Sequence, residues 1–407
     1  MLVALLVYNG RSFVPRTLES LAALRRATTQ AGRNDVEIVV FDDASPEPGW
    51  SETLRELCVR HDFGYYYSPR NLGIPRNMSL ALLYGQASNH DFVLLLNSDV
   101  VVASNLVDAM IDAAHGAEFE FADDDAASHR EGRVASVTAW SNNASIFSLP
   151  NDDADRFLAD QYVVDRVASS LADEFADEPA ELPVGMGFCI AVAVDAVRAI
   201  GVMDPVFGRG YCEEVDWCCR ASAAGWRHVL ATNTFVYHMG SATTRLAGLL
   251  APGEQTVQVN EAIIDDRYPD YRRRVAAWED AGGLRDVVAR GLRRLVTEAA
   301  RVRGYRLDAT WLPKNPKDAY GLGLEDLVQM QVSPDGAAPL LQGCVDGFRI
   351  EIPVGTEGIL AAVGAVVGVA PAEVRISDHG SVASQLEDGA TLAGVKVARV
   401  IRYPERV

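Results

Sequence analysis

The chain has 407 residues, 49% of them hydrophobic, and a formal net charge of −19 at pH 7. This length predicts more than one domain, with enough apolar residues for a large core. The negative charge would repel phosphates and excludes general nucleic-acid binding. No apolar run approaches the roughly 20 residues of a membrane helix. The six cysteines show neither zinc-ligand spacing nor a small disulfide framework, so we expect reduced thiols.

The first residues, Met1 to Val7, are apolar enough to resemble the core of a secretion signal. They lack a basic leader and a small-residue cleavage site, and they run directly into Tyr8-Asn9. We therefore expect a buried first strand and a cytoplasmic protein.

From residue 1 to about 245, short β-branched runs alternate with helical patterns. The predicted strands are Leu2–Val7, Glu37–Phe41, Phe63–Ser68 and Phe92–Leu96. The predicted helices between them are Val14–Arg26, Trp50–His61 and Ile74–Ala87. This order indicates an α/β fold with a mostly parallel sheet flanked by helices. Ligands bind beyond the carboxyl ends of the strands in such sheets.

Polar residues stand at these strand ends and should converge on one crevice; they are Asn9, Asp42, Asp43 and Asp99. We favour a nucleotide contact for Asp42, through a base edge or ribose, because the first strand delivers Tyr8-Asn9 beside it. The alternative is a turn residue before Ser45-Pro46. Arg76-Asn77 opens a helix and is either a further nucleotide contact or a surface position.

The turn Asn97-Ser98-Asp99 follows an apolar strand. Asp99 is either a helix cap or a ligand for Mg²⁺ or Mn²⁺, and Ser104 is better placed as the cap of a helix at 105–114. Such cations are often held by few protein groups plus substrate phosphates. His238 follows an acidic motif by one helix and one strand and could return to the same crevice as a second ligand. Asn97 could contribute a carbonyl or a hydrogen bond to ribose.

The acidic motif is a cluster of three carboxylates, Glu213, Glu214 and Asp216. Crowded carboxylates repel one another, which raises a pKa and suits a general base. The alternative is that they are acids favoured at a helix N-terminus by the dipole. Arg220 stands four residues after Asp216 and could simply pair with it. Arg209, in the preceding glycine-flanked loop, could bring positive charge to a diphosphate.

These residues together resemble the family 2 glycosyltransferases of GT-A fold. The resemblance spans residues 1 to 245 in consistent order, and it looks closest to the rhamnosyl- and galactofuranosyltransferase-like branch. The motifs that carry it are Val7-Tyr8-Asn9, Val40-Phe41-Asp42-Asp43-Ala44-Ser45, Asn71-Leu72-Gly73, Arg76-Asn77, Leu96-Asn97-Ser98-Asp99, Ser141-Asn142-Asn143-Ala144, Gly185-Met186-Gly187-Phe188-Cys189, Val202-Met203-Asp204, Gly208 to Arg220, and Val236-Tyr237-His238.

The resemblance implies an inverting, metal-dependent transfer of a hexosyl or deoxyhexosyl group from a nucleoside diphosphate sugar, such as a UDP- or dTDP-sugar. Asp99 and His238 would hold the metal, and Asp42 the base or ribose. Glu214 matches the second acid of the family's Glu-Asp pair, the usual base, although Glu213 and Asp216 stay open. The acceptor could be a glycan, a lipid-linked intermediate, a protein side chain or a modified nucleic-acid base.

Two rival functions remain. A sugar nucleotidyltransferase usually carries a glycine-rich phosphate loop after its first strand, where this chain reads Tyr8-Asn9-Gly10-Arg11. A non-catalytic module that binds sugar nucleotides or glycans would bind a donor without turning it over.

The remainder of the chain divides into a basic helical linker at 246–335 and a small domain at 336–407. Residues 267–306 form an arginine-rich amphipathic pattern, read as a linker helix packed on the acidic catalytic domain. The alternative is contact with an anionic membrane surface, with the protein peripheral there, or a homo-oligomer. The last residues resemble a β-grasp, ubiquitin-like fold of strand, helix, strand, turn and strand. The acidic stretches Glu118–Asp125 and Asp152–Glu181 are expected to be solvated insertions.

Overall fold

The computed structural model describes residues 1–33, 35–119, 132–149, 160–176, 178–240, 253–309, 328–332, 340–345, 348–353, 359–376 and 381–399. The chain divides into two compact units. The first unit comprises Met1–Ser148 and Ala159–Val287, and the second comprises Leu149–Leu158 and Val288–Val407. No helix among the described residues combines the length and apolar character that a bilayer crossing requires.

The first unit is built on a nine-stranded sheet. Its first half is parallel and runs β3-β2-β1-β4, as the alternating strands and helices predict. β1 is buried along its whole length, which fits a central strand covered on both faces. The strands of this half are β1 (Leu2–Val7), β2 (Glu37–Asp42), β3 (Gly64–Tyr67) and β4 (Phe92–Asn97).

The second half of the sheet is mixed in direction, and the sequence did not predict it. β8 pairs antiparallel with β4 and β6, whereas β6 and β9 run parallel. The long strand β9 also pairs antiparallel with β5 and with β7. The strands are β5 (Val100–Val102), β6 (Val134–Ser141), β7 (Ala180–Leu182), β8 (Cys189–Ala193) and β9 (Arg227–His238).

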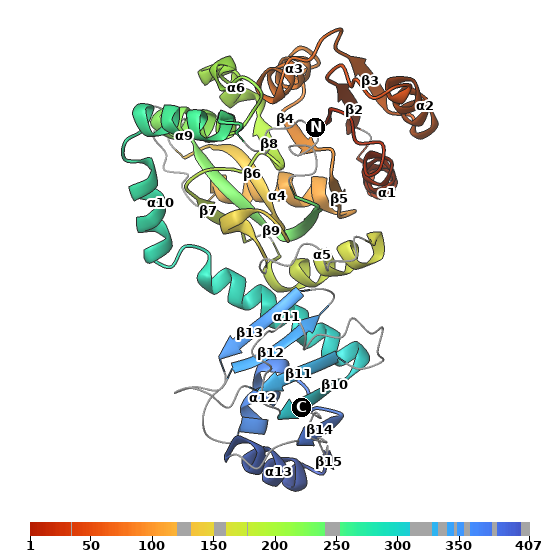
Figure 1. Ribbon diagram of the computed structural model, residues 1–407, viewed down its shortest axis with the longest axis vertical. Coiled ribbons are helices and arrows are strands. Elements are labelled where there is room, and N and C mark those ends of the chain that lie inside the picture. Colours follow the sequence, from red (N-terminus) through yellow and green to blue (C-terminus); the bar gives the residue numbers. More distant parts are fainter. Residues whose placement is uncertain are drawn as a thin grey trace. The chain divides into compact units, whose positions relative to one another are not determined.

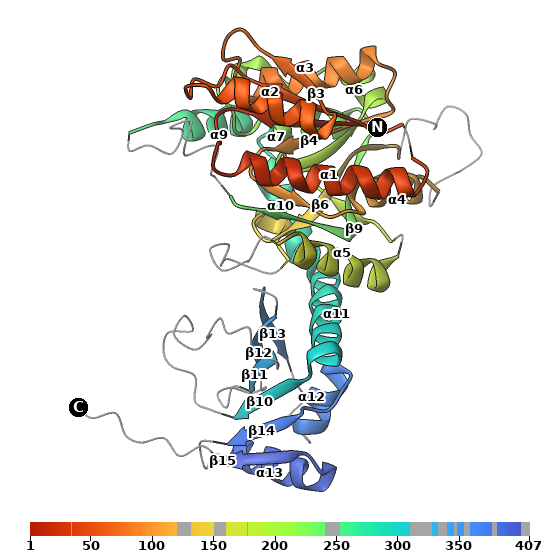
Figure 2. The same ribbon diagram turned by 90° about the vertical axis from the view of Figure 1, so that its right-hand side faces the viewer.

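Helices cover the sheet on both faces, so the predicted α/β class is confirmed (Figure 1). α1 (Val14–Gln30) contacts α2 (Trp50–His61) and α4 (Leu106–Phe119), and α1 and α4 run side by side in Figure 2. α3 (Ile74–Ala87) contacts β1, β4 and α6 (Val194–Ile200). The core between α3 and the sheet includes Leu2, Phe41, Met78, Val93 and Trp217.

The predicted solvated insertion at Asp152–Glu181 is wrong for the part that the structure describes. Helix α5 (Gln161–Phe175) packs along β9 and buries Val164, Val167, Leu171 and Phe175. The stretch also contains apolar residues at helical spacing, which its many acidic residues made difficult to recognise in the sequence. Residues 120–131 and 150–159 lie outside the described residues.

The predicted linker region contains three helices, α9 (Thr256–Arg267), α10 (Tyr271–Asp280) and α11 (Arg285–Arg303), of which the last two lie in the arginine-rich stretch. The apolar side of α11 contributes Val296, Ala299 and Ala300 to the core of the second unit. This face of α11 is therefore covered by protein of the second unit, whereas the sequence favoured packing on the catalytic domain.

The second unit contains a six-stranded sheet of order β13-β12-β11-β10-β14-β15. The predicted small α+β unit is present, but its order departs from the predicted β-grasp. A helix, α13 (Ser381–Ala393), precedes the last strand and has no counterpart in the predicted order, and its buried Leu386 and Ala390 lie four residues apart on one face. The predicted turn at Asp378-His379-Gly380 lies outside the described residues. The other elements are β10 (Tyr305–Ala309), β11 (Val328–Val332), β12 (Leu340–Val345), β13 (Phe348–Pro353), α12 (Ile359–Val367), β14 (Glu373–Ile376) and β15 (Lys396–Arg399).

Candidate active site

Asp99 and His238 lie side by side. Val100, the first residue of β5, is the register partner of His238 at the end of β9. The backbone N–H of Met239 donates to the carbonyl of Asp99 at 3.0 Å. This pairing places His238 Nε2 3.5 Å from Asp99 Oδ1, with both side chains largely buried. The two predicted metal ligands therefore share one location.

The imidazole of His238 is held in one orientation. Its Nδ1 lies 2.9 Å from the carbonyl oxygen of Asn143, which can only accept, so Nδ1 carries the proton and Nε2 faces Asp99. Asn142 brackets the backbone of His238, accepting from its N–H at 2.8 Å and donating to its carbonyl at 3.0 Å. The ring of Phe188 stacks on the imidazole at 5.0 Å. Metal-binding histidines commonly show this carbonyl contact on the other ring nitrogen.

Gly240 explains how Asn143 reaches this position. Its φ is +76°, and a Cβ there would lie 1.8 Å from Asn143 Nδ2. Only glycine allows so close an approach. The motif Ser141-Asn142-Asn143-Ala144 thus has a positional role that its sequence alone did not specify.

The donor set fits a small divalent cation bound with few protein ligands. A carboxylate oxygen and a neutral imidazole nitrogen suit Mn²⁺, and Mg²⁺ accepts one carboxylate with substrate oxygens. Burial lowers the pKa of His238, but Asp99 and the Asn143 carbonyl outweigh it and raise that pKa. No group of three potential metal-binding side chains occurs among the described residues. Water and substrate oxygens would complete the coordination of a cation held by these two side chains.

Asp42 is fully buried and carries an internal hydrogen-bond network. Its Oδ1 accepts from the N–H and hydroxyl of Ser45 at 3.0 and 2.7 Å. Its Oδ2 accepts from the hydroxyls of Ser51 and Tyr65 at 2.7 and 2.8 Å. Four donors match the roughly four lone-pair sites of a carboxylate. Asp42 therefore orders the loop after β2, and its predicted nucleotide contact stays a prediction.

Asp43 connects the strand end to two loops. Its oxygens accept from the backbone N–H groups of Leu72 and Gly73 at 2.7 and 3.0 Å. Gly73 has φ +79°, and a Cβ there would lie 2.3 Å from the carbonyl oxygen of Gly208. The Asn71-Leu72-Gly73 turn is thus pressed against the loop that carries Arg209.

The other predicted nucleotide contacts lie around the same sheet edge. Tyr8 and Asn9 are half-buried, and Asn9 binds Ser45 through its N–H at 2.8 Å. Asn97 donates its N–H to the carbonyl of Phe188 at 2.9 Å. Arg76 and Arg209 are exposed, and Arg209 lies 3.9 Å from Glu254. The structure leaves the nucleotide roles of Tyr8, Asn9, Asn97, Arg76 and Arg209 as predictions.

Glu213 and Glu214 open helix α7 (Glu213–Ala223). Burial and the neighbouring charge of Glu214 raise the pKa of Glu213 well above its usual value. Burial also raises the pKa of Glu214. The N–H of Gly187 donates to the Glu214 carboxylate and lowers that pKa by a smaller amount. Oε2 of each residue is buried and has no hydrogen-bond partner among the described residues. Burial thus raises the pKa of both carboxyls, and the charge of Glu214 adds to the rise at Glu213.

The carboxylate pair and the Asp99–His238 pair meet at Gly187-Phe188. A Cβ on Gly187 would lie 3.4 Å from Glu214 Cδ. Phe188, the next residue, stacks on His238 and accepts from Asn97. Two adjacent residues thus contact Glu214 of the acid pair and His238 of the predicted metal-binding pair.

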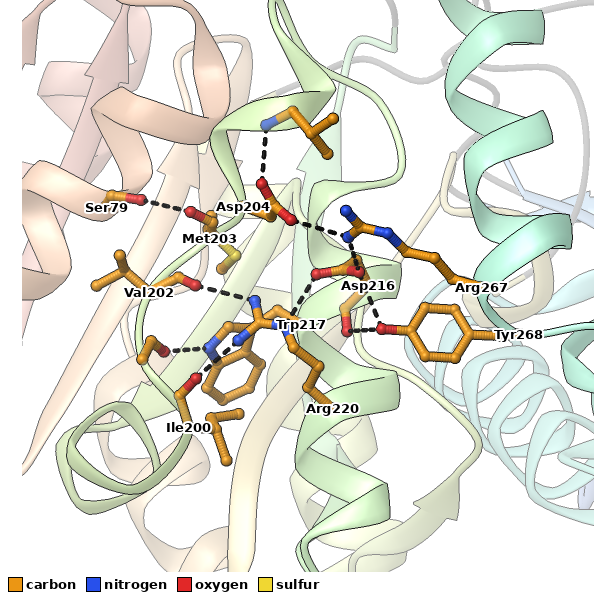
Figure 3. A network of polar contacts seen from close by, with 12 residues as sticks. Ser79, Ile200, Val202, Met203, Asp204, Asp216, Trp217, Arg220, Arg267 and Tyr268 are labelled. Atoms are coloured by element: carbon orange, nitrogen blue, oxygen red, sulfur yellow. Dashed lines mark hydrogen bonds and ion pairs between the residues drawn. The ribbon is translucent and has the colours of Figure 1, made fainter.

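Asp216 has a different environment from the two glutamates (Figure 3). Its fully buried carboxylate accepts from Arg220 at 2.9 Å, Arg267 at 2.7 Å and the hydroxyl of Tyr268 at 2.9 Å. The predicted pairing with Arg220 is confirmed. All of these contacts anchor α7, so Asp216 is occupied as a structural anion and is poorly placed to act as a base.

Residues 2–163 match the family model described as glycosyl transferase family 2. The match contains Asp42, Asp43 and Asp99 and ends before α7 and His238. No curated protein matches the chain.

Several solved structures resemble the fold. The mannosyltransferase PcManGT from Pyrobaculum calidifontis, in complex with GDP-Man and Mn²⁺, is 14% identical, with a TM-score of 0.40 and 74% of each chain covered. GalNAc-T7, with UDP, GalNAc and Mn²⁺, is 15% identical, with a TM-score of 0.39 over 58% of this chain and 43% of that one. S. aureus TarS 1-349 is 15% identical, with a TM-score of 0.38 over 74% and 80%.

Proposed function

We propose that the first unit is a glycosyltransferase that moves a sugar from a nucleoside diphosphate donor to an acceptor hydroxyl with inversion, in a divalent-metal-dependent reaction. The observation that carries the proposal is the meeting of an acid pair and an Asp–His pair at Gly187-Phe188. The family match to residues 2–163 supports the same class.

Asp99 and His238 would hold Mn²⁺ or Mg²⁺, which would supply positive charge for the departing diphosphate. In a neutral His238 imidazole the Asn143 carbonyl keeps the proton on Nδ1, which leaves the Nε2 lone pair for a metal. The Thr17 hydroxyl shares its one hydrogen between the carbonyls of Ser98 and Val100, at 2.8 and 2.7 Å, and so anchors the turn. This pre-arrangement keeps both ligands in place before a donor arrives. Acidic side chains alone would repel a diphosphate, so a bound cation is needed to neutralise the charge between them.

Glu214 is our candidate for the base that removes the acceptor proton. Two adjacent buried carboxylates repel each other when both are charged, and we assign the negative charge of the pair to Glu214, whose carboxylate accepts from the N–H of Gly187. Its raised pKa makes the carboxylate a better proton acceptor than an exposed glutamate. Asp216 is excluded from the proposal because two arginines and a tyrosine already hold its oxygens.

The donor we propose is a UDP- or dTDP-hexose or deoxyhexose, and the acceptor is a glycan, a lipid-linked intermediate or a protein side chain. The first experiment is a thermal-shift panel of nucleotide sugars with and without Mn²⁺. A ligand that binds only the folded state raises the melting temperature by mass action. A true donor should raise it only when the metal is present.

Glu214→Gln then tests the chemistry, with Glu213→Gln beside it. Loss of a general base typically lowers the rate by about 10²- to 10⁴-fold. We expect Glu214→Gln to lose transfer while its Mn²⁺-dependent thermal shift with donor remains. Transfer by Glu214→Gln at the wild-type rate would disprove the base assignment. Release of pyrophosphate instead of nucleoside diphosphate would favour a nucleotidyltransferase.

A further inference from the structure

Helix α9 holds the loop that leads into the carboxylate pair. Asn260 on α9 is buried, and its Nδ2 lies 3.0, 2.7 and 3.1 Å from the carbonyl oxygens of Phe207, Gly210 and Tyr211. An amide nitrogen has two hydrogens, so it is shared among three acceptors. One side chain thus binds three backbone carbonyl groups of this loop.

The loop needs such support because its backbone is strained. Tyr211 and Cys212 have φ of +77° and +71°, a left-handed conformation that costs free energy for residues with a Cβ. Cys212 is the residue directly before Glu213, and its carbonyl accepts from the N–H of Asp216 at 3.0 Å. The conformation of these two residues therefore sets where helix α7 begins.

The same loop also supports Glu213 directly, because the N–H of Tyr211 donates to the Glu213 carboxylate. A relaxed loop would lose this contact and shift the start of α7. Further along α9, Arg267 and the adjacent Tyr268 bind Asp216 (Figure 3). These two contacts hold α7 at Asp216, whereas Asn260 holds the loop that comes before the helix.

We infer that Asn260 is a positioning residue of the reaction: it holds the strained Tyr211–Cys212 backbone so that helix α7 begins where Glu214 meets Gly187. The inference rests on the proposed function for its catalytic consequence, but the loop-holding role stands on the contacts alone. It also brings α9, which lies outside the family match at 2–163, into the active site.

Asn260→Asp is the sharpest test, because it keeps the shape and replaces the donor by an oxygen that faces three carbonyls. Asn105→Asp is the matched control: Asn105 Nδ2 also donates to a backbone carbonyl, that of Asn233 at 2.9 Å, in the same unit. Asn260→Ser, which retains a donor, replaces Asn260→Asp if the latter does not fold.

We expect Asn260→Asp to lower kcat by about 10- to 100-fold, the scale of a misplaced catalytic group. The KM for the donor should stay within about threefold, as for an interaction made in the transition state. Hydrogen exchange should accelerate in residues 207–216 of Asn260→Asp and stay unchanged there in Asn105→Asp. The apparent pKa on the acidic limb of the kcat/KM profile should also move, which general destabilisation does not explain.

A second substitution tests the mechanism. Glycine adopts φ of +71° without strain, so Cys212→Gly added to Asn260→Asp should recover at least about threefold of the lost kcat. Equal kcat in Asn260→Asp and Asn105→Asp, or no recovery in the double variant, would overturn the inference. If the wild-type protein turns over no nucleotide sugar, the proposed function fails. Hydrogen exchange then still tests whether Asn260 holds the loop. Selective acceleration in 207–216 would then support that role, and unchanged exchange would refute it.

Discussion

His238 Nε2 faces Asp99 Oδ1 at 3.5 Å across the antiparallel pair of β5 and β9. The two residues come from distant parts of the sequence, and the register of a three-residue strand, β5, brings them together. A shift of that register by one residue would turn the Asp99 side of the pair to the other face of the sheet. The hydrogen bonds of Thr17 to the carbonyls on either side of Asp99 oppose such a shift.

We expect Asp99→Asn and His238→Gln to remove the Mn²⁺-dependent thermal shift, because each deletes one of two protein ligands. Chelation of the metal should inactivate the wild-type protein, and added Mn²⁺ should restore it. Asp195→Asn is the control, since Asp195 is an exposed carboxylate paired with Arg133 and Arg198. An unchanged metal response in both variants would contradict the metal site.

Glu213→Gln should stabilise the protein increasingly as pH rises. Burial and Glu214 raise the pKa of Glu213 above its ordinary value of 4.5, so the folded state keeps a proton that the unfolded state releases. Stability is therefore lost as pH rises from about 4.5 towards the raised pKa. Melting curves from pH 4 to pH 9 would measure the difference in melting temperature between Glu213→Gln and the wild type. We expect no such difference at the acidic end and a growing one as pH rises. A constant difference would argue against a retained proton.

Asp216→Asn should destabilise the first unit by about 3 kcal/mol, because it leaves Arg220 and Arg267 facing a neutral group in a buried network. Denaturant unfolding would measure the change. The exposed Asp195→Asn control should cost no more than about 1 kcal/mol. Comparable losses in the two variants would show that Asp216 does not anchor α7.

Gly73→Ala should both destabilise the protein and impair transfer, since its Cβ would lie 2.3 Å from the Gly208 carbonyl. Gly49→Ala is a matched control with φ of +67° and open space around the added Cβ. Both variants suffer the strain of a left-handed backbone, about 1 kcal/mol or more. Only Gly73→Ala displaces the loop that carries Arg209. The loss of stability and activity in Gly73→Ala beyond that in Gly49→Ala therefore measures the contact between Gly73 and the Gly208 carbonyl.

The strands and helices of the first half could be predicted because their signals are local. The helices Trp50–His61 and Ile74–Ala87 have the predicted bounds, and β4 differs only by including Asn97. Apolar spacing and terminal residues encode such elements within one segment. The pairing of Asp216 with Arg220 was accessible for the same reason, since four residues is one turn of a helix.

The second half of the sheet could not be predicted in the same way. β5 and β7 have three residues each, and only their pairing with β9 makes them strands. α5 lay hidden in an acidic stretch, because its character depends on the face that meets β9. Short strands and amphipathic helices take their identity from their neighbours in space.

The sequence by itself determined which residue types were available at the site: acids and amides after the strand ends, a cluster of carboxylates and a histidine closing β9. Only the tertiary structure decided what each one faces. It enclosed Asp42 among four donors and Asp216 between two arginines, and it brought Glu214 against Gly187. The reason is physical: the reactivity of a carboxylate depends on burial, nearby charge and hydrogen bonds, and distant segments supply all three.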